Sequence, residues 1–261
     1  MMHMARKLLV SDVDGTLLGN DRDLCRFVAW YGRYRYRVRL VYASGNFYES
    51  IAELVRQKLL PKPCAIIGGV GTDLRLYPSG RPIFAWDERL HRCWNQSRVR
   101  EALADCNRLE PQPEEVQSES KVSYFLRNAS PDELEMIRSA LRNADIDAEL
   151  VYSSQRDLDV LPAGINKGAA AKFLAAYYDY QPNDVIVCGN SANDLAMFQH
   201  GFRGIVVNNA HPELAALESA TVYKSPRSFA AGVLDGLNYW VKRDSVSQQP
   251  EFRRQTIMNS S

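Results

Sequence analysis

The stretch Leu8-Leu9-Val10-Ser11-Asp12-Val13-Asp14-Gly15-Thr16-Leu17-Leu18 decides the fold that we expect for this chain. Its apolar start is typical of a short buried strand, and a turn follows in which Gly15 lets the chain reverse sharply. Residues two apart on a strand share one face, so Asp12 and Asp14 are expected to face one site while Val13 is buried. Two close carboxylates repel each other unless a cation lies between them or one binds a proton. The spacing therefore predicts either a metal site or an acid/base pair.

The composition of the 261-residue chain is that of an ordinary globular protein, with 46% hydrophobic and 24% charged residues. The 32 Lys and Arg residues balance 31 Asp and Glu residues to a net charge of +1, so we expect no nucleic-acid partner and no membrane partner. Five scattered cysteines without a C-x-x-C pair argue against a disulfide framework and a zinc site. No stretch is apolar enough to span a bilayer, and residues 1–7 leave no room for a signal peptide, so a reducing, cytoplasmic location is expected.

Two further strands end in polar turns, at the position where open α/β sheets bind ligands. Residues 38–43 lead into Ser44-Gly45-Asn46, where a hydroxyl and a backbone N–H suit a phosphate oxygen, although a serine helix cap is also common. Residues 184–188 lead into Gly189-Asn190-Ser191-Ala192-Asn193-Asp194, a second cluster of oxygen ligands. Lys167 begins a helix, although helix N-termini prefer acids. Its position leaves open either a solvated lysine or a cation aimed at a phosphate or at the carboxylate pair.

The spacing of apolar residues predicts an α/β protein with an insert of about seventy residues, over about residues 86–159. The ends of the insert are expected near the Gly71 turn and near Pro162-Ala163-Gly164. The insert combines helical periodicity over residues 87–109 and 131–144 with strand-like patterns over residues 121–126 and 148–153. A small hairpin is expected just before it, with strands over residues 74–77 and 82–86. A helix is expected to begin at residue 195, and a closing helix spans residues 229–241 before a polar, frayed tail.

The run Arg33-Tyr34-Arg35-Tyr36-Arg37-Val38-Arg39 interleaves arginine with tyrosine. Such a run can stack on nucleic acid, but it is also typical of a charged helix end that leads into the next strand. With a neutral chain and no second basic cluster, the helix end is the favoured interpretation. The glycine-rich stretch Gly68-Gly69-Val70-Gly71 matches neither a phosphate loop nor a complete dinucleotide fingerprint, so no nucleotide site is predicted there.

Four short motifs, taken in chain order, resemble those of the haloacid-dehalogenase-like phosphatases. They are Asp12-Val13-Asp14-Gly15-Thr16, Ser44-Gly45, Lys167-Gly168 and Gly189-Asn190-Ser191-Ala192-Asn193-Asp194. The stretches Ile66-Ile67-Gly68-Gly69-Val70-Gly71-Thr72 and Arg156-Asp157-Leu158-Asp159 look like the sucrose-phosphate and mannosylfructose-phosphate phosphatase branch. The resemblance implies a Rossmann-like three-layer core with a parallel sheet, plus an inserted α+β cap domain. The expected divisions are a discontinuous core over residues 1–84 and 160–245, a cap over residues 85–159, and a flexible tail over residues 246–261.

The resemblance also implies a role for each motif. Asp12 would attack phosphorus to form an aspartyl-phosphate, and Asp14 would serve as acid and base. Mg²⁺ would bind at the same place, and Lys167 would hold the phosphate and stabilise the charge that moves with it. The metal ligands implied are Asp12, Asp14 through its backbone carbonyl, Asn190 and Asp194. The phosphate ligands implied are Ser44, Gly45, Lys167 and Asn193. In the cap, Lys121 and Tyr124 on one strand, with Arg156 and Asp157, are polar groups that could face the sugar or face solvent.

Asn190 and Asn46 depart from the family pattern, which usually has Asp and often Arg at these positions. An amide oxygen coordinates Mg²⁺ without the negative charge, so a weakened metal site is expected. The main hypothesis is an Mg²⁺-dependent phosphatase of a sugar phosphate, such as sucrose-6-phosphate or mannosylfructose-phosphate, that is a monomer or weak dimer. The alternative is a catalytically weakened or non-catalytic sugar-phosphate-binding module associated with a glycosyltransferase. A nucleic-acid phosphatase is a third hypothesis, which the neutral charge opposes.

Overall fold

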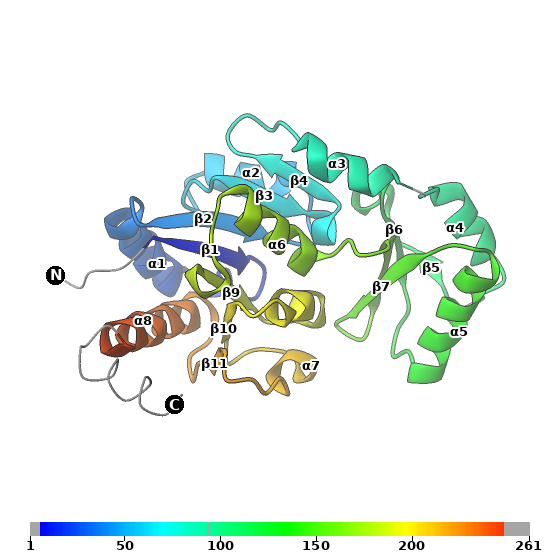
Figure 1. The fold of residues 1–261 in the computed structure, drawn as a ribbon. Coiled ribbons are helices and arrows are strands. Elements are labelled where there is room, and N and C mark those ends of the chain that lie inside the picture. The colour runs from blue at the N-terminus through cyan, green and yellow to red at the C-terminus, as the bar shows by residue number, and fades with distance from the viewer. Residues whose placement is uncertain (1–5, 93, 248–261) are drawn as a thin grey trace, which may run out of the picture.

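Two β-sheets form the framework of the molecule (Figure 1), which we describe from a computed structural model for residues 6–92 and 94–247. The strands are β1 (Lys7–Asp12), β2 (Val38–Ala43), β3 (Ala65–Gly68), β4 (Asp73–Leu76), β5 (Glu110–Pro111), β6 (Val122–Phe125), β7 (Ala148–Ser153), β8 (Asp157–Pro162), β9 (Val185–Gly189), β10 (Arg203–Val206) and β11 (Val222–Lys224). The helices are α1 (Asp21–Tyr34), α2 (Tyr48–Arg56), α3 (Phe84–His91), α4 (Gln96–Ala102), α5 (Pro131–Asn143), α6 (Lys167–Tyr177), α7 (Pro212–Ala215) and α8 (Phe229–Ser247). Short 3₁₀ helices occupy Gly69–Gly71, Glu114–Val116, Pro182–Asp184 and Ala192–Gln199.

The larger sheet has seven strands in the order β11-β10-β9-β1-β2-β3-β4. Every neighbouring pair from β11 to β3 is parallel, and only the edge strand β4 runs antiparallel to its neighbour. β1 is buried along its whole length because helices cover both faces of the sheet. Leu9 packs toward α1, α2 and α8, whereas Leu8 and Val10 pack toward α3, α6 and α7. The result is the three-layer α/β core that the sequence predicts.

The smaller sheet, with the order β5-β6-β8-β7, is antiparallel and carries α4 and α5 on one side. Its apolar core includes Val122, Leu158 and Ile137, from two strands and α5. We call this part of the chain the cap. Figure 1 shows that β1 and β2 point toward it, so the carboxyl ends of the core strands face the cap. The expected division between residues 159 and 160 falls inside β8, whose pairing in the cap sheet continues to Pro162.

Some elements next to the cap differ from the predictions. The second strand of the expected hairpin, over residues 82–86, is wrong, because only Pro82 bridges to Arg75 and α3 begins at once. Ile83, Trp86 and Leu90 are all buried at helical spacing, which stabilises a helix there. The single helix expected over residues 87–109 is also wrong. It is two helices, and α4 has its own N-cap at Asn95, whose side chain accepts a hydrogen bond from the backbone of Arg98.

The carboxyl-terminal part of the core contains two further differences. The helix expected from residue 195 is a 3₁₀ helix that spans Ala192–Gln199, and the edge strand β11 had no prediction. α8 continues to Ser247, beyond the expected end at residue 241, so it includes the first two residues of the expected tail. Residues 248–261 of that tail lie outside the described residues. Among the helices of the described residues, none is both long and apolar enough to cross a membrane.

Candidate active site

The carboxyl ends of three neighbouring core strands bring the sequence motifs together. β1 lies between β2 and β9, with Asp12 in register with Ala43 and Ser11 in register with Cys188. The motif residues that follow β2 and β9 therefore begin at the level where β1 ends. Asp12 is only 4% exposed, and Val13 is fully buried between the two aspartates. Asp14, one residue further on, is exposed and lines the same cleft as Asp12, as the spacing predicts.

Lys167 lies at the centre of this site, with no part of its side chain exposed. Its Nζ donates to Asp12 Oδ1 at 2.8 Å, to Asp194 Oδ1 at 2.7 Å and to Asn193 Oδ1 at 2.9 Å. All three donors of the ammonium group are thus satisfied by oxygens from two distant segments. The lysine that begins a helix against its local preference is a buried cation that binds two carboxylates, and the interpretation as a solvated lysine is wrong.

Close packing of α6 against the 3₁₀ helix Ala192–Gln199 puts Lys167 in position. A Cβ atom on Gly168 would lie 2.1 Å from the carbonyl oxygen of Ala196, so only glycine permits this approach. The N-cap of α6 is Asn166, whose side chain accepts a hydrogen bond from the backbone of Ala169. In the pair Lys167-Gly168, the lysine therefore supplies the charge, and the glycine leaves the space that lets α6 approach the 3₁₀ helix.

The charges in this cluster are unequal, because one buried cation faces two carboxylates. Burial raises the pKa of Asp12 to about 7, and the charge of Asp194 adds to this effect, while Lys167 and Thr16 oppose it. Burial alone would lower the pKa of Lys167, but the charges of Asp12 and Asp194 outweigh it and hold that pKa above its usual value. Lys167 is therefore cationic at neutral pH, and Asp12 is balanced between its two forms when no metal is bound.

A cleft of about 390 Å³ opens between the core and the cap above Asp12. The core residues that line it include Asp12, Asp14, Gly45, Asn46, Asn190 and Asn193. From the cap, the turn between β7 and β8 contributes Ser153, Ser154, Arg156 and Asp157. Nδ2 of Asn46 donates to Asp14 Oδ2 at 2.9 Å, so Asn46 orients the second aspartate of the pair. Most of the predicted phosphate and metal ligands thus border one space.

The oxygen donors around Asp12 include a fitting place for Mg²⁺, a hard cation that takes oxygen ligands. The hydroxyl oxygen of Thr16 lies 2.7 Å from Asp12 Oδ2 and 3.3 Å from Asn190 Oδ1. The carboxylate oxygen of Asp12 and the amide oxygen of Asn190 therefore face the same small region. Asp194 has another use, because its Oδ1 binds Lys167 and its Oδ2 accepts from the backbone N–H groups of Asn190 and Ser191. Within the described residues, no group of three or more His, Cys, Asp or Glu side chains is arranged for a metal.

Comparison with known proteins identifies the family. The model of the family described as sucrose-6F-phosphate phosphohydrolase matches residues 5–241. The chain belongs to this family. It is 35% identical over 239 residues to a mannosylfructose-phosphate phosphatase of Agrobacterium fabrum, a match that covers 90% of this chain and 96% of that protein. Together with the cleft, these findings show a phosphoric monoester hydrolase of the haloacid-dehalogenase-like class.

Two further relatives agree with this family. A probable sucrose-phosphatase of Arabidopsis thaliana is 34% identical over 239 residues, which cover 87% of this chain but only 56% of the plant protein. The structure of a sucrose-phosphatase from Synechocystis sp. in complex with sucrose and phosphate superimposes with a TM-score of 0.85 at 29% identity. That match covers 91% of this chain and 98% of the Synechocystis chain, so the core and the cap are both shared.

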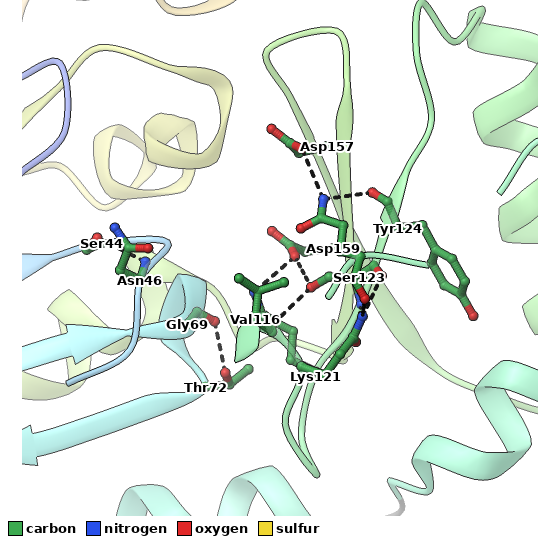
Figure 2. A network of polar contacts seen from close by, with 12 residues as sticks. Ser44, Asn46, Gly69, Thr72, Val116, Lys121, Ser123, Tyr124, Asp157 and Asp159 are labelled. Atoms are coloured by element: carbon green, nitrogen blue, oxygen red, sulfur yellow. Dashed lines mark hydrogen bonds and ion pairs between the residues drawn. The ribbon is translucent and has the colours of Figure 1, made fainter. Parts of the chain in front are cut away.

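Four of the predicted ligands do not line the cleft: Lys167 and Asp194 are fully buried, and Lys121 and Ser44 make other contacts. Lys121 is 3% exposed, and its Nζ binds Asp159 Oδ1 at 3.2 Å and lies 5.3 Å from the centre of the Phe47 ring. Figure 2 shows Lys121, Ser123 and Asp159 converging inside the cap. Ser44 is fully buried, and its Oγ accepts from the backbone N–H of Asn46 at 3.0 Å. As placed, Lys121 stabilises the cap, and Ser44 shapes the turn that presents Gly45.

Sequence reasoning missed the role of the glycine-rich turn after β3. Backbone N–H groups of Gly69 and Val70 donate to the carbonyls of Asn46 and Ser44, at 3.0 and 3.1 Å. Gly71 has a φ of +114°, and a Cβ on it would lie 2.6 Å from the backbone of Asn166. The turn therefore packs between the loop over residues 44–46 and the start of α6. The three glycines of this turn, Gly68, Gly69 and Gly71, are the signal in the sequence for such close backbone packing.

Proposed function

We propose that the protein is an Mg²⁺-dependent phosphatase of a disaccharide phosphate, such as sucrose-6-phosphate or mannosylfructose-phosphate, that works through an aspartyl-phosphate. The observation that carries the proposal is the carboxylate of Asp12. It is oriented by Lys167 on one oxygen and by Thr16 on the other, at the floor of a cleft that Asp14 also lines. A nucleophile held from both sides needs little reorganisation before it attacks.

In the first step an oxygen of Asp12 attacks phosphorus, and the bond between phosphorus and the sugar oxygen breaks. The leaving oxygen takes a proton from Asp14, which is exposed to the cleft and can exchange protons with solvent. In the second step water attacks the phosphorus of the aspartyl-phosphate, Asp14 accepts a proton from that water, and the bond to Asp12 breaks. The products are the free sugar and inorganic phosphate, and both aspartates return to their starting states.

Asn193 is the candidate in the cleft for donating to the phosphate, and the buried Lys167 acts on the phosphate through its charge. Oδ1 of Asn193 accepts from Lys167 and from the Ser191 hydroxyl, so its amide Nδ2 points away from them, toward Gly45. That group can donate to a phosphate oxygen, and the cationic Lys167 directly beneath stabilises the charge that develops there. Removing such a donor typically lowers the rate by about 10²–10³.

Asp12, the backbone carbonyl of Asp14 and Asn190 would hold Mg²⁺, which supplies positive charge for the phosphate oxygens and lets an anionic nucleophile approach them. Asp194 supports the site through Lys167 and through the backbone at residues 190 and 191. Of the three direct ligands, only Asp12 brings a charge. We therefore propose weaker metal binding than an aspartate at position 190 would give.

The cap turn over residues 153–157 is the proposed contact for the sugar. Ser153, Ser154, Arg156 and Asp157 line the same cleft as the two catalytic aspartates, and the guanidinium of Arg156 binds both oxygens of Asp157. This pair presents fixed donors and acceptors, which suits the hydroxyl groups of a sugar. Because the pair belongs to the cap, a change in cap position changes its distance from Asp12.

A phosphate-release assay over a panel of sugar phosphates tests the proposal. We expect Mg²⁺-dependent release from at least one disaccharide phosphate, and none from the Asp12→Asn variant with the same substrate. The Asn190→Asp variant should reach its full rate at lower Mg²⁺ concentrations. The proposal is wrong if neither the native protein nor Asn190→Asp releases phosphate from any substrate at saturating Mg²⁺. Binding of a sugar phosphate without turnover would instead support a binding module.

A further inference from the structure

A second pocket lies at the opposite end of the sheet from the active-site cleft. It has a volume of about 320 Å³ and forms where β2 and β3 begin, beside the end of α1. β2 has six residues, about 17–20 Å of extended chain, so this pocket is well separated from Asp12. Among the described residues that line it, none is acidic and five are cationic: Arg6, Arg35, Arg37, Arg39 and Lys62.

Three cations of this pocket differ from the surface arginines that pair with acids, as Arg56 does with Glu53. Among the described residues, Arg35, Arg39 and Lys62 form no ion pair. Like charges gathered in one hollow repel each other, and the chain as a whole is nearly neutral. A concentrated positive field inside a recess is the electrostatic signature of a site for an anion.

Aromatic rings hold two of these arginines in place. The guanidinium carbon of Arg39 lies 4.1 Å from the centre of the Tyr178 ring and 5.9 Å from that of Tyr180. Arg35 lies 4.8 Å from the ring of Tyr36 and donates to its hydroxyl at 2.9 Å. A stacked guanidinium keeps donors at its edge for two oxygens of one phosphate. Tyr36 is 81% exposed at the rim, where an aromatic face is available to a planar ring.

We propose that this pocket binds a small molecule with two adjoining phosphates, such as a nucleoside diphosphate. The pyrophosphate group lies among Arg35, Arg39 and Lys62, and a base packs against Tyr36. The volume of the pocket is at the lower end of the range of about 300–1,000 Å³ for small-ligand sites. A nucleic acid would need a longer basic groove to follow its backbone. The site is separate from the phosphatase cleft and does not depend on the proposed reaction.

Calorimetric titration of the full chain in EDTA tests the proposal, with UDP, ADP, inorganic pyrophosphate, inorganic phosphate and a single-stranded oligonucleotide as probes. EDTA keeps metal out of the catalytic cleft. The test variant is Arg35→Glu/Lys62→Glu, and a milder version is Arg35→Gln/Lys62→Gln. The matched control is Arg33→Glu, which reverses a charge in the same stretch but does not line the pocket. Thermal melting of each free variant shows that the fold is retained.

Saturable binding of UDP, ADP or pyrophosphate is expected, weaker at higher salt, with phosphate binding less tightly than pyrophosphate. The Glu variant should lose affinity by about tenfold or more and the Gln variant by less, while Arg33→Glu binds like the native protein. Tighter binding of UDP or ADP than of pyrophosphate, abolished by Tyr36→Ala, would show that the base is bound too. Equal binding would show that the pyrophosphate alone is recognised, and both results support the site. The proposal is overturned if no phosphate compound saturates the protein, if Arg33→Glu weakens binding equally, or if only the oligonucleotide binds.

Discussion

Replacing Lys167 by methionine tests the site at its most connected residue. The Lys167→Met change keeps an unbranched chain of similar length but removes the ammonium group and its three hydrogen bonds of 2.7–2.9 Å. Asp12 and Asp194, which are 6% and 0% exposed in their side chains, then lose the cation between them. Two buried carboxylates that keep hydrogen bonds but have no cation to balance their charge are costly in a protein interior.

The expected cost follows from burial. Removing one partner of a buried ion pair typically costs about 3–5 kcal/mol, a large part of the roughly 5–15 kcal/mol that stabilises a domain. For a protein of this size each kcal/mol lowers the melting temperature by about 2–4 °C, so a fall of about 6–20 °C is expected. Phosphate release should fall by about 10²–10³ as well, because Lys167 also supplies charge to the phosphate.

Urea and thermal unfolding in EDTA, together with phosphate release in Mg²⁺, measure the two effects separately. The control is Lys172→Met, which removes an exposed lysine from the same helix and should change neither quantity. The decisive variant is Lys167→Met/Asp194→Asn, because it removes one of the two carboxylates left without a cation. It should regain much of the lost stability and remain inactive.

A stability loss below about 1 kcal/mol for Lys167→Met would refute the reasoning, because a fully buried ion pair cannot be removed so cheaply. The reasoning would also fail if the double variant were no more stable than the single one. That result would mean that Asp194 does not need Lys167, and that the backbone N–H groups at residues 190 and 191 satisfy its charge alone.

Three further predictions concern the cleft. Asn190→Asp should tighten Mg²⁺ binding by about tenfold or more, which corresponds to about 1.4 kcal/mol per tenfold. A calorimetric titration without substrate measures this affinity, and an unchanged affinity would show that residue 190 is not a metal ligand. Asn46→Ala should lower kcat more than it raises KM, because Asp14 loses the donor that orients it, and Asn46→Gln should restore part of the rate. Because the pKa of Asp12 is raised to about 7, the metal-free protein should lose stability as the pH rises from about 4 to 7, where the folded state holds a proton that the unfolded state releases. Asp12→Asn should show a smaller loss between these pH values in urea unfolding, and equal losses would contradict the raised pKa.

The sequence predicts the large sheet well because its strands are short apolar runs that end in polar turns. β2 begins and ends at the predicted residues 38 and 43, and in the cap sheet β7 does the same at residues 148 and 153. The region between residues 82 and 109 was harder, because apolar residues alone do not distinguish a strand from one turn of helix. There Ile83, Trp86 and Leu90 pack against the core, and this tertiary contact decides the outcome.

The sequence predicts which residues belong to the candidate site, but it does not predict which of them contact one another. The motifs identify Asp12, Lys167 and Asp194, yet nothing in their spacing shows that one lysine binds both carboxylates. The expectation that Lys121 faces the sugar came from its place on a polar strand. Its partner Asp159 lies 38 residues away on a neighbouring strand, so local pattern gives no sign of the ion pair that buries it.

The buried charges explain why position 190 matters so much to Asp12. Lys167 compensates one of two buried carboxylates, so one negative charge is left over even with asparagine at position 190. Burial, together with that excess charge, raises the pKa of Asp12 to about 7. An aspartate at position 190 would add a second uncompensated charge within reach of the Thr16 hydroxyl that binds Asp12. Such a site would bind Mg²⁺ more tightly and depend on it more strongly, because repulsion between the carboxylates would otherwise favour the protonated, inactive form of Asp12. Asn190 therefore weakens the binding of Mg²⁺. Because it carries no negative charge, it also keeps the carboxylate of Asp12 partly ionised when no metal is bound.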